Sequence, residues 1–229
     1  MTAEDAATAI DAAFLRPGEF IDSDHPAVAA FAARVAAGAP DPAAAAVKLY
    51  YAVRDEIRYD PYVAYDDPEN FRASSVLARG RGFCVGKAAL FTAAARARGI
   101  AARIAFADVR NHLATPRLLS LIGSGIFIYH GITELFLEGR WVKATPTFNL
   151  SLCEKFGLKA LDFDGRADAL LHPFDRGGKR HMEYLRQRGS YADVPVEILI
   201  PELSQAYPRL TRLAESERGD FAREAEEKG

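Results

Sequence analysis

Apolar residues in the first hundred positions recur every three or four residues, the spacing of one face of a helix. Alanine is abundant there and favours the same structure. Pro26, just after Asp24, marks the start of one predicted helix, and Gly38 marks its end. A second helix is predicted from Asp41 to about Arg58. The first part of the chain is therefore predicted to be mainly helical.

A further helix is predicted to begin at Cys84, after a loop over residues 62–80 with one short helical turn at residues 75–77. Gly99 ends this helix. Its apolar residues lie three or four positions apart and define a buried face, formed by Val85, Ala88, Phe91 and Ala95. A cysteine thus stands at the beginning of a helix whose body is expected to lie in the core.

The following part of the chain changes to the pattern of strands. Residues 101–107 are predicted to form one strand, and residues 126–137 and 140–145 to form a hairpin. Residues 110–125, between them, are expected to be irregular and could form a flap.

After residue 146 the pattern weakens. A helix is predicted near residues 179–188. The last nineteen residues contain ten charges and few apolar anchors, so an exposed, fraying helix is expected there.

Composition and charge exclude several classes of protein. The chain has 49% hydrophobic residues and a formal net charge of −2, as an ordinary globular protein does. Without a basic surplus, neither nucleic acid nor an anionic membrane is expected as a partner. Charges interrupt the apolar runs well before the length of a transmembrane helix. Residues 1–5 lack the positive charge of a secretory signal, so a cytoplasmic location is expected.

Cys84 lies in the segment Gly82-Phe83-Cys84-Val85-Gly86 at the predicted helix start. A cysteine nucleophile acts as the thiolate, and the N–H groups and dipole of a helix N-terminus lower its pKa from about 8.5. The flanking glycines would let a substrate backbone approach, and the Cys84 N–H would point at the oxyanion of an attacked carbonyl. We therefore interpret Cys84 as a nucleophile.

His130 stands within the first strand of the predicted hairpin, where its imidazole could hold the thiolate and protonate the leaving group. Cys153, the only other cysteine, has no such setting and is interpreted as a small, inert hydrophobe. Two cysteines are too few for a disulfide scaffold, so both are expected to be reduced.

Other polar and aromatic residues have simpler interpretations. His172 and His181 lack the close spacing of metal ligands, and neither a metal nor another cofactor is expected. His112 is expected in an exposed loop. Tyr59 and Tyr62 could donate to an oxyanion, but partial burial explains them more simply.

The segments around Cys84 and His130 resemble the transglutaminase-like superfamily, a papain-like fold group. In that family the nucleophile's helix ends in Gly-Ile-Pro-Ala-Arg, and a strand with His-Ala-Trp-Val-Glu-Val precedes Gly-Arg-Trp-Val-Pro-Val-Asp-Pro-Thr. Residues 99–103 (Gly-Ile-Ala-Ala-Arg) match the helix end, and residues 139–142 (Gly-Arg-Trp-Val) match the turn. The resemblance covers about residues 45–148.

The resemblance implies an α+β fold of papain-like, transglutaminase-like architecture. A helical N-terminal half would carry Cys84 and pack on an antiparallel β-sheet that carries His130. The sequence has no repeat and no flexible linker, so residues 1–229 are expected to form one domain. Its core is expected at residues 45–148, with an N-terminal helical extension at residues 1–44 and a C-terminal extension at residues 149–229.

One position departs from the family pattern. The catalytic aspartate, fifteen residues after the histidine, is replaced by Thr145. A threonine hydroxyl can orient an imidazole but cannot stabilise its positive charge as a carboxylate does. Either Thr145 acts as a weak orienter, another residue (Asn149, or more remotely Asp162 or Asp164) takes its place, or the site is inactive.

The resemblance implies cysteine-dependent acyl chemistry on a peptide or small amide, by a peptidase, an amidase or a transglutaminase-like enzyme, through a thioester on Cys84. An enzyme similar to arylamine N-acetyltransferases is an alternative, although residues 81–84 fit its Arg-Gly-Gly-x-Cys pattern poorly. A different alternative is a non-catalytic module that binds peptides. The oligomeric state stays open.

Overall fold

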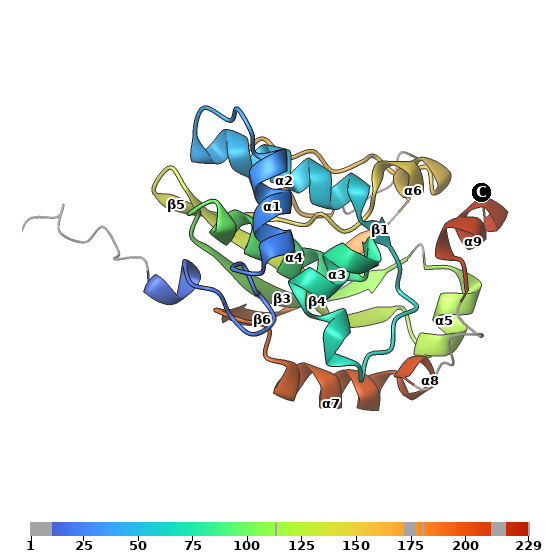
Figure 1. Cartoon of the computed structure of the whole chain (residues 1–229). Helices are drawn as coiled ribbons and strands as arrows, with labels where there is room; N and C mark the ends of the chain where they lie inside the picture. The colour runs from blue at the N-terminus through green and yellow to red at the C-terminus, as the bar shows by residue number, and fades with distance from the viewer. Residues whose placement is uncertain (1–10, 113, 172–176, 180, 212–218, 229) are drawn as a thin grey trace, which may run out of the picture.

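The computed structural model describes residues 11–112, 114–171, 177–179, 181–211 and 219–228. Helices α1 to α4 gather on one side of a β-sheet, and α7 and α8 lie below it in the view of Figure 1. The helices are α1 (Pro26–Val35), α2 (Pro42–Glu56), α3 (Ala73–Arg79), α4 (Cys84–Ala97), α5 (Pro116–Ile122), α6 (Leu150–Lys155), α7 (Val196–Ala206), α8 (Pro208–Thr211) and α9 (Phe221–Lys228), with short 3-10 helices at Ala12–Phe14 and Pro68–Asn70. The strands are β1 (Arg58–Tyr59), β2 (Arg81–Gly82), β3 (Ala102–Asn111), β4 (Ile126–Leu137), β5 (Arg140–Ala144) and β6 (Met182–Tyr191).

The main sheet has four antiparallel strands in the order β5-β4-β3-β6, and β1 and β2 form a separate parallel pair. In the register of the main sheet, Ala107 of β3 lies opposite His130 of β4, and Ala144 of β5 lies opposite Thr133 of β4. The predicted strand and hairpin are confirmed. So is the α+β class, with a helical N-terminal half packed on an antiparallel sheet. The division into a core and two extensions stays a prediction.

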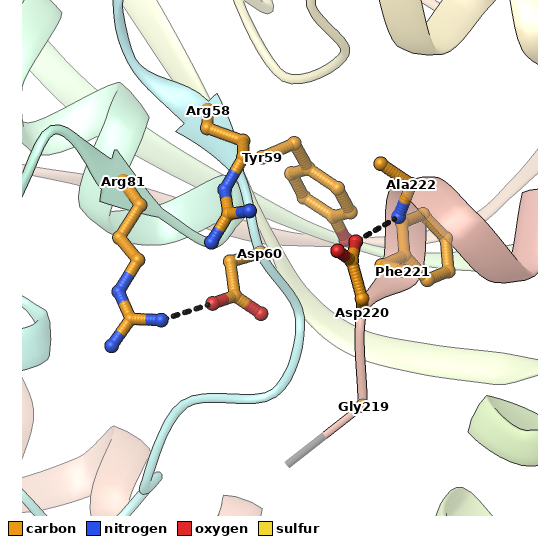
Figure 2. Close-up of a pocket in the computed structure, with 8 residues that line it drawn as sticks. All are labelled: Arg58, Tyr59, Asp60, Arg81, Gly219, Asp220, Phe221 and Ala222. Atoms are coloured by element: carbon orange, nitrogen blue, oxygen red, sulfur yellow. Dashed lines mark hydrogen bonds and ion pairs between the residues drawn. The ribbon is translucent and has the colours of Figure 1, made fainter.

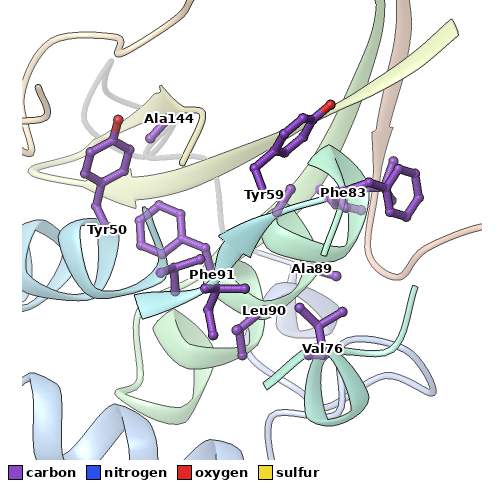
Figure 3. Packing of buried hydrophobic residues seen from close by; sticks show 14 of the residues in the cluster. Tyr50, Tyr59, Val76, Phe83, Ala89, Leu90, Phe91 and Ala144 are labelled. Atoms are coloured by element: carbon purple, nitrogen blue, oxygen red, sulfur yellow. The ribbon is translucent and has the colours of Figure 1, made fainter. Parts of the chain in front are cut away.

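The central element is α4, which lies between the other N-terminal helices and the sheet. It contacts α1, α2 and α3 as well as β3 and β4, and every residue from Val85 to Arg96 is buried. Figure 3 shows Leu90 and Phe91 of this helix packed among buried residues of neighbouring elements. The Phe91 and Tyr50 ring centroids are 5.9 Å apart. Close packing along its whole length fixes α4, and with it the position of Cys84.

The helix predicted near residues 179–188 is wrong. These positions belong largely to β6, which pairs antiparallel with β3 and places Gly189 opposite Phe106. The local sequence contains Glu, Leu, Gln and Arg, which favour helices. The segment forms a strand because it pairs with β3 and because the Tyr191 ring contacts Phe106, with 5.8 Å between the ring centroids.

The stretch at 110–125 is more regular than expected. Among its described residues it contains the end of β3 and the helix α5, and β4 begins directly after it at Ile126. Thr115 caps α5 by accepting a hydrogen bond from the Leu118 N–H at 3.2 Å. Likewise, the single turn predicted at residues 75–77 is the longer helix α3.

The end of the chain is not a frayed, exposed helix where the structure describes it. In α9, Phe221 and Ala225 are buried. The Phe221 and Tyr59 ring centroids are 5.5 Å apart, and the Tyr62 hydroxyl donates to Glu224 Oε2 at 2.5 Å. α9 is therefore docked on the segment between α2 and α3. None of the helices in the described parts of the chain has both the length and the apolar character needed to cross a bilayer.

Candidate active site

Cys84 is the first residue of α4 and is half-buried. It follows β2 after a single residue, Phe83, which is the N-cap and makes no hydrogen bond to the helix through its side chain. The first N–H groups of α4 are therefore not taken by a capping side chain. This is the helix-start setting that the sequence indicates.

The glycines around Cys84 serve packing. A Cβ atom on Gly82 would lie 2.9 Å from Val76 Cγ1, and one on Gly86 would lie 2.7 Å from the Asn70 carbonyl oxygen. Neighbouring groups thus already fill the space that the sequence interpretation assigned to a substrate backbone. Glycine is required at both positions so that Val76 of α3 and the Asn70 carbonyl group can pack against the start of α4.

Two opposing effects act on the Cys84 thiol. Burial raises its pKa to about 11. The backbone N–H groups of Gly131, Val85 and Cys84 itself act in the opposite direction, because they favour the thiolate. The sulfur therefore faces N–H donors contributed by both α4 and β4.

Gly131 is the point where β4 meets the start of α4. A Cβ atom there would lie 2.8 Å from Val85 Cα and 3.0 Å from the Cys84 carbonyl oxygen. His130, the preceding residue, is only 4% exposed, and burial lowers its pKa to about 4. Its Nε2 atom has no hydrogen-bond partner among the described residues. The structure brings the backbones of the two predicted residues together, and a hydrogen bond between their side chains stays a prediction.

The residue before His130 has an unusual backbone. Tyr129 has a φ of 58°, in the left-handed region that a tyrosine seldom adopts. Its N–H donates to Oδ1 of buried Asp108 at 3.2 Å, and Arg188 Nε donates to the same oxygen at 2.6 Å. The Arg188 guanidinium also lies 4.2 Å from the centroid of the Tyr129 ring. These contacts hold a strained bend that sets the direction of His130, and no local sequence pattern could have indicated them.

Thr145 follows β5 directly and is 1% exposed. Continuing the β4–β5 register places it beside Ile132, on the same face of the sheet as His130. Its hydroxyl makes no hydrogen bond of good geometry within the described ranges, although it lies near enough to the Tyr184 phenol to favour the ionised phenol. Thr147, which the sequence interpretation did not single out, is also buried with an unpartnered hydroxyl in this part of the structure.

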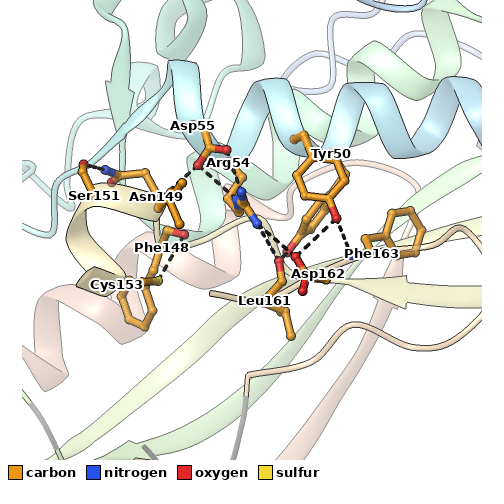
Figure 4. Close-up of polar contacts among 12 residues, drawn as sticks. Tyr50, Arg54, Asp55, Phe148, Asn149, Ser151, Cys153, Leu161, Asp162 and Phe163 are labelled. Atoms are coloured by element: carbon orange, nitrogen blue, oxygen red, sulfur yellow. Dashed lines mark hydrogen bonds and ion pairs between the residues drawn. The ribbon is translucent and has the colours of Figure 1, made fainter. Parts of the chain in front are cut away.

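The alternative third residues are engaged elsewhere (Figure 4). Asn149 Oδ1 accepts a hydrogen bond from the Tyr59 N–H at 3.2 Å, and its Nδ2 donates to Ser151 Oγ at 2.7 Å. Asp162 is 72% exposed and lies 3.8 Å from Arg54. Asp164 accepts from two backbone N–H groups of its own loop. Thr145 is therefore the candidate whose hydroxyl makes no hydrogen bond of good geometry among the described residues, although the Tyr184 phenol lies close to it.

The remaining site candidates also have places in the structure. Tyr59 is buried, and the Tyr62 hydroxyl is committed to Glu224, so Tyr62 is not a free donor for an oxyanion. His112 lies 3.6 Å from Glu183. His172 lies outside the described residues, and within those residues no three His, Cys, Asp or Glu side chains gather to hold a metal ion.

Lys87 is a feature that the sequence interpretation missed. It lies one turn after Cys84 and is fully buried, and its Nζ donates to the carbonyl groups of Arg54 at 2.9 Å and Ile57 at 2.6 Å. It therefore closes the end of α2 and ties that end to the first turn of α4. Burial lowers its pKa to about 7. A lysine in an otherwise apolar helix face was the available signal.

The buried lysine predicts a pH dependence of stability. Between about pH 7 and 9 the unfolded chain keeps the Lys87 proton and the folded chain releases it, so the free energy of unfolding should rise with pH. The substitution Lys87→Met removes this contribution. The slope of the free energy of unfolding against pH should therefore fall by about 1.4 kcal/mol per pH unit. Urea unfolding at several pH values measures both slopes. Equal slopes would show that Lys87 stays charged in the folded protein.

A pocket of about 280 Å³ opens beside the strands that lead to Cys84 (Figure 2). One wall is formed by β1, β2 and Asp60, and the other by the start of α9. Its lining residues are Arg58, Tyr59, Asp60, Arg81, Gly219, Asp220, Phe221 and Ala222.

Comparison with known proteins identifies the family. The model of the transglutaminase-like superfamily matches residues 29–146, more than half of the chain, and the chain therefore belongs to this superfamily. No curated protein matches it. It is similar to the solved structure of a proposed cysteine protease from Cytophaga hutchinsonii, with 16% identity and a TM-score of 0.49 over 81% of this chain and 48% of that chain. The chain thus spans about half the length of that protein. Membership of the superfamily supports cysteine-based catalysis at the level of the family.

Proposed function

We propose that this protein is a cysteine-dependent enzyme that cleaves amide bonds, with Cys84 as the nucleophile and His130 as its acid–base partner. The observation that carries the proposal is the meeting of α4 and β4: the Gly131 N–H faces the Cys84 sulfur, and His130 is the adjacent residue. Membership of the transglutaminase-like superfamily supports the same chemistry.

The reaction begins when the Cys84 thiol passes its proton to His130 and the sulfur bonds to the amide carbonyl carbon. The imidazolium then gives that proton to the amine nitrogen as the C–N bond breaks, which leaves a thioester on Cys84. Water, deprotonated by His130, attacks the thioester, releases the acid and restores the thiol. The N–H groups of Cys84 and Gly131 would stabilise the oxyanion in both steps. We favour hydrolysis over transfer to a protein amine by family analogy.

Burial makes the first proton transfer the demanding step. The pKa of Cys84 is raised to about 11 and that of His130 is lowered to about 4, so each group alone stays neutral at pH 7. Thiolate and imidazolium must therefore form together, each stabilising the other.

A second candidate function is a non-catalytic peptide-binding module. The raised pKa of Cys84, the lowered pKa of His130 and the Nε2 of His130, unpartnered in the described structure, favour it.

Thiol labelling separates the two functions. With iodoacetamide near pH 6, followed by peptide mass mapping, Cys84 should be labelled well before Cys153. Cys84 is half-buried and faces N–H donors, whereas Cys153 is buried with its sulfur 3.8 Å from the Phe148 carbonyl oxygen. His130→Gln should slow labelling of Cys84 roughly tenfold or more and leave Cys153 unchanged. Equal labelling of both cysteines, seen only after denaturation, would favour the binding module.

A further inference from the structure

Two arginines lie opposite each other in the strand pair that leads to Cys84. In the parallel pair β1–β2, Arg58 is opposite Arg81, and opposite residues project from the same face. Like charges placed opposite each other destabilise a strand pair. Asp60 compensates Arg81 through a contact of 3.2 Å, but the Arg58 guanidinium has no ion pair or hydrogen bond among the described residues. The strand pair thus keeps an unfavourable charge arrangement that an anionic group would relieve.

Both arginines line the 280 Å³ pocket, and Figure 2 shows their side chains on one side and Asp220 on the other. Asp220 Oδ1 accepts from the Ala222 N–H at 3.1 Å and caps the start of α9. With two arginines and two aspartates among the lining residues, the pocket has no net formal charge. The Arg58 guanidinium, unpaired within the described ranges, can bind a singly charged carboxylate through two parallel hydrogen bonds, and the aspartates repel a doubly charged phosphate more strongly than a carboxylate.

The pocket borders the strand that leads to Cys84, although Cys84 itself does not line it. Arg81 precedes Cys84 by three residues, in the strand that leads into α4. Tyr59 lines the pocket, and its phenol is near enough to Cys84 for a thiolate there to raise the pKa of Tyr59. We therefore expect a ligand anchored between the arginines to extend toward Cys84.

We propose that Arg58 and Arg81 form a carboxylate-binding subsite, which selects amide substrates that carry a free carboxylate close to the bond to be cleaved. The inference rests on the proposed function and names its substrate class. A peptide's C-terminal carboxylate and an acidic side chain offer the same chemistry, and model ligands distinguish them.

The test is a binding titration of the full-length, ¹⁵N-labelled chain by NMR, which needs no turnover. N-acetyl-Ala-Ala as the free acid should bind about tenfold more tightly than its C-terminal amide. Arg58→Gln should bring the two affinities to within about twofold, and this exposed substitution leaves the fold untouched. Arg98→Gln, an exposed arginine at the far end of α4, is the matched control and should keep the full difference.

N-acetyl-Glu-amide, whose only carboxylate is on the side chain, shows which source is preferred: weaker binding than the free dipeptide acid assigns the subsite to a C-terminus, and tighter binding assigns it to an acidic side chain. Equal binding of acid and amide to the natural chain, or equal competition by inorganic phosphate, would overturn the inference. The binding measurement does not depend on catalysis. If Cys84 is unreactive but the chain still binds the acid selectively, only the proposed function is refuted. A reactive Cys84 without selectivity refutes the subsite alone.

Discussion

Gly131→Ala is expected to disable Cys84 while most of the fold survives. The added Cβ would lie 2.8 Å from Val85 Cα and 3.0 Å from the Cys84 carbonyl oxygen. Both are backbone atoms of a helix that is buried along its length, so β4 must move away from the start of α4. The Gly131 N–H would then leave the sulfur. We expect iodoacetamide labelling of Cys84 to slow at least about tenfold, and the free energy of unfolding to fall by about 1–3 kcal/mol.

Gly125→Ala is the matched control. Gly125 directly precedes β4, and a Cβ there would meet only the Asn111 carbonyl oxygen at 3.6 Å, an ordinary contact. In Gly125→Ala, the labelling rate of Cys84 and the urea midpoint should stay close to those of the natural chain. If Gly131→Ala labels Cys84 at the natural rate, the Gly131 N–H has no part in activating the thiol.

Thr145→Asp is expected to raise the pKa of His130 and to speed the reaction of Cys84. Thr145 is on the same face of the sheet as His130, and both Thr145 Oγ1 and His130 Nε2 lack hydrogen-bond partners in the described structure. A carboxylate there would favour the imidazolium, typically by about 1–3 pKa units. NMR titration of the imidazole measures this shift from its present value of about 4. Labelling of Cys84 at neutral pH should become about tenfold faster for each unit.

Two variants separate the charge of the new side chain from its hydrogen bond. Thr145→Asn has nearly the same shape as Thr145→Asp without the charge, so it should leave the pKa of His130 low. Asn149→Ala should change the labelling rate little, because the Asn149 side chain is engaged with Tyr59 and Ser151. The reverse pattern, slow labelling in Asn149→Ala and no gain in Thr145→Asp, would make Asn149 the third residue. If no variant alters the rate, neither residue orients His130.

Local signals predicted the elements that carry the candidate pair. A proline at a helix start, a glycine after a helix end and the three-to-four spacing of apolar residues each act within a few positions. They sufficed for the helix that begins at Cys84 and for the hairpin that contains His130. The family resemblance was readable for the same reason, since its motifs are continuous segments.

Long-range contacts decided what local signals could not. The strand β6 looks helical by composition, and only the open edge of β3, some eighty residues earlier, makes it a strand. The charges of α9 predict an exposed helix, yet its Phe221 is buried against Tyr59. The burial of Lys87 depends on the two carbonyl groups at the end of α2 that accept its hydrogen bonds.

The sequence by itself determined which residues could do chemistry: a cysteine at a helix start, a histidine on a strand and a threonine in place of an aspartate. The tertiary structure decided how those residues are held. The strained bend at Tyr129 depends on Asp108 and Arg188, which are distant in sequence and adjacent only in the folded sheet. The raised pKa of Cys84 and the lowered pKa of His130 are likewise effects of burial, which exists only after the helix and the sheet have packed together.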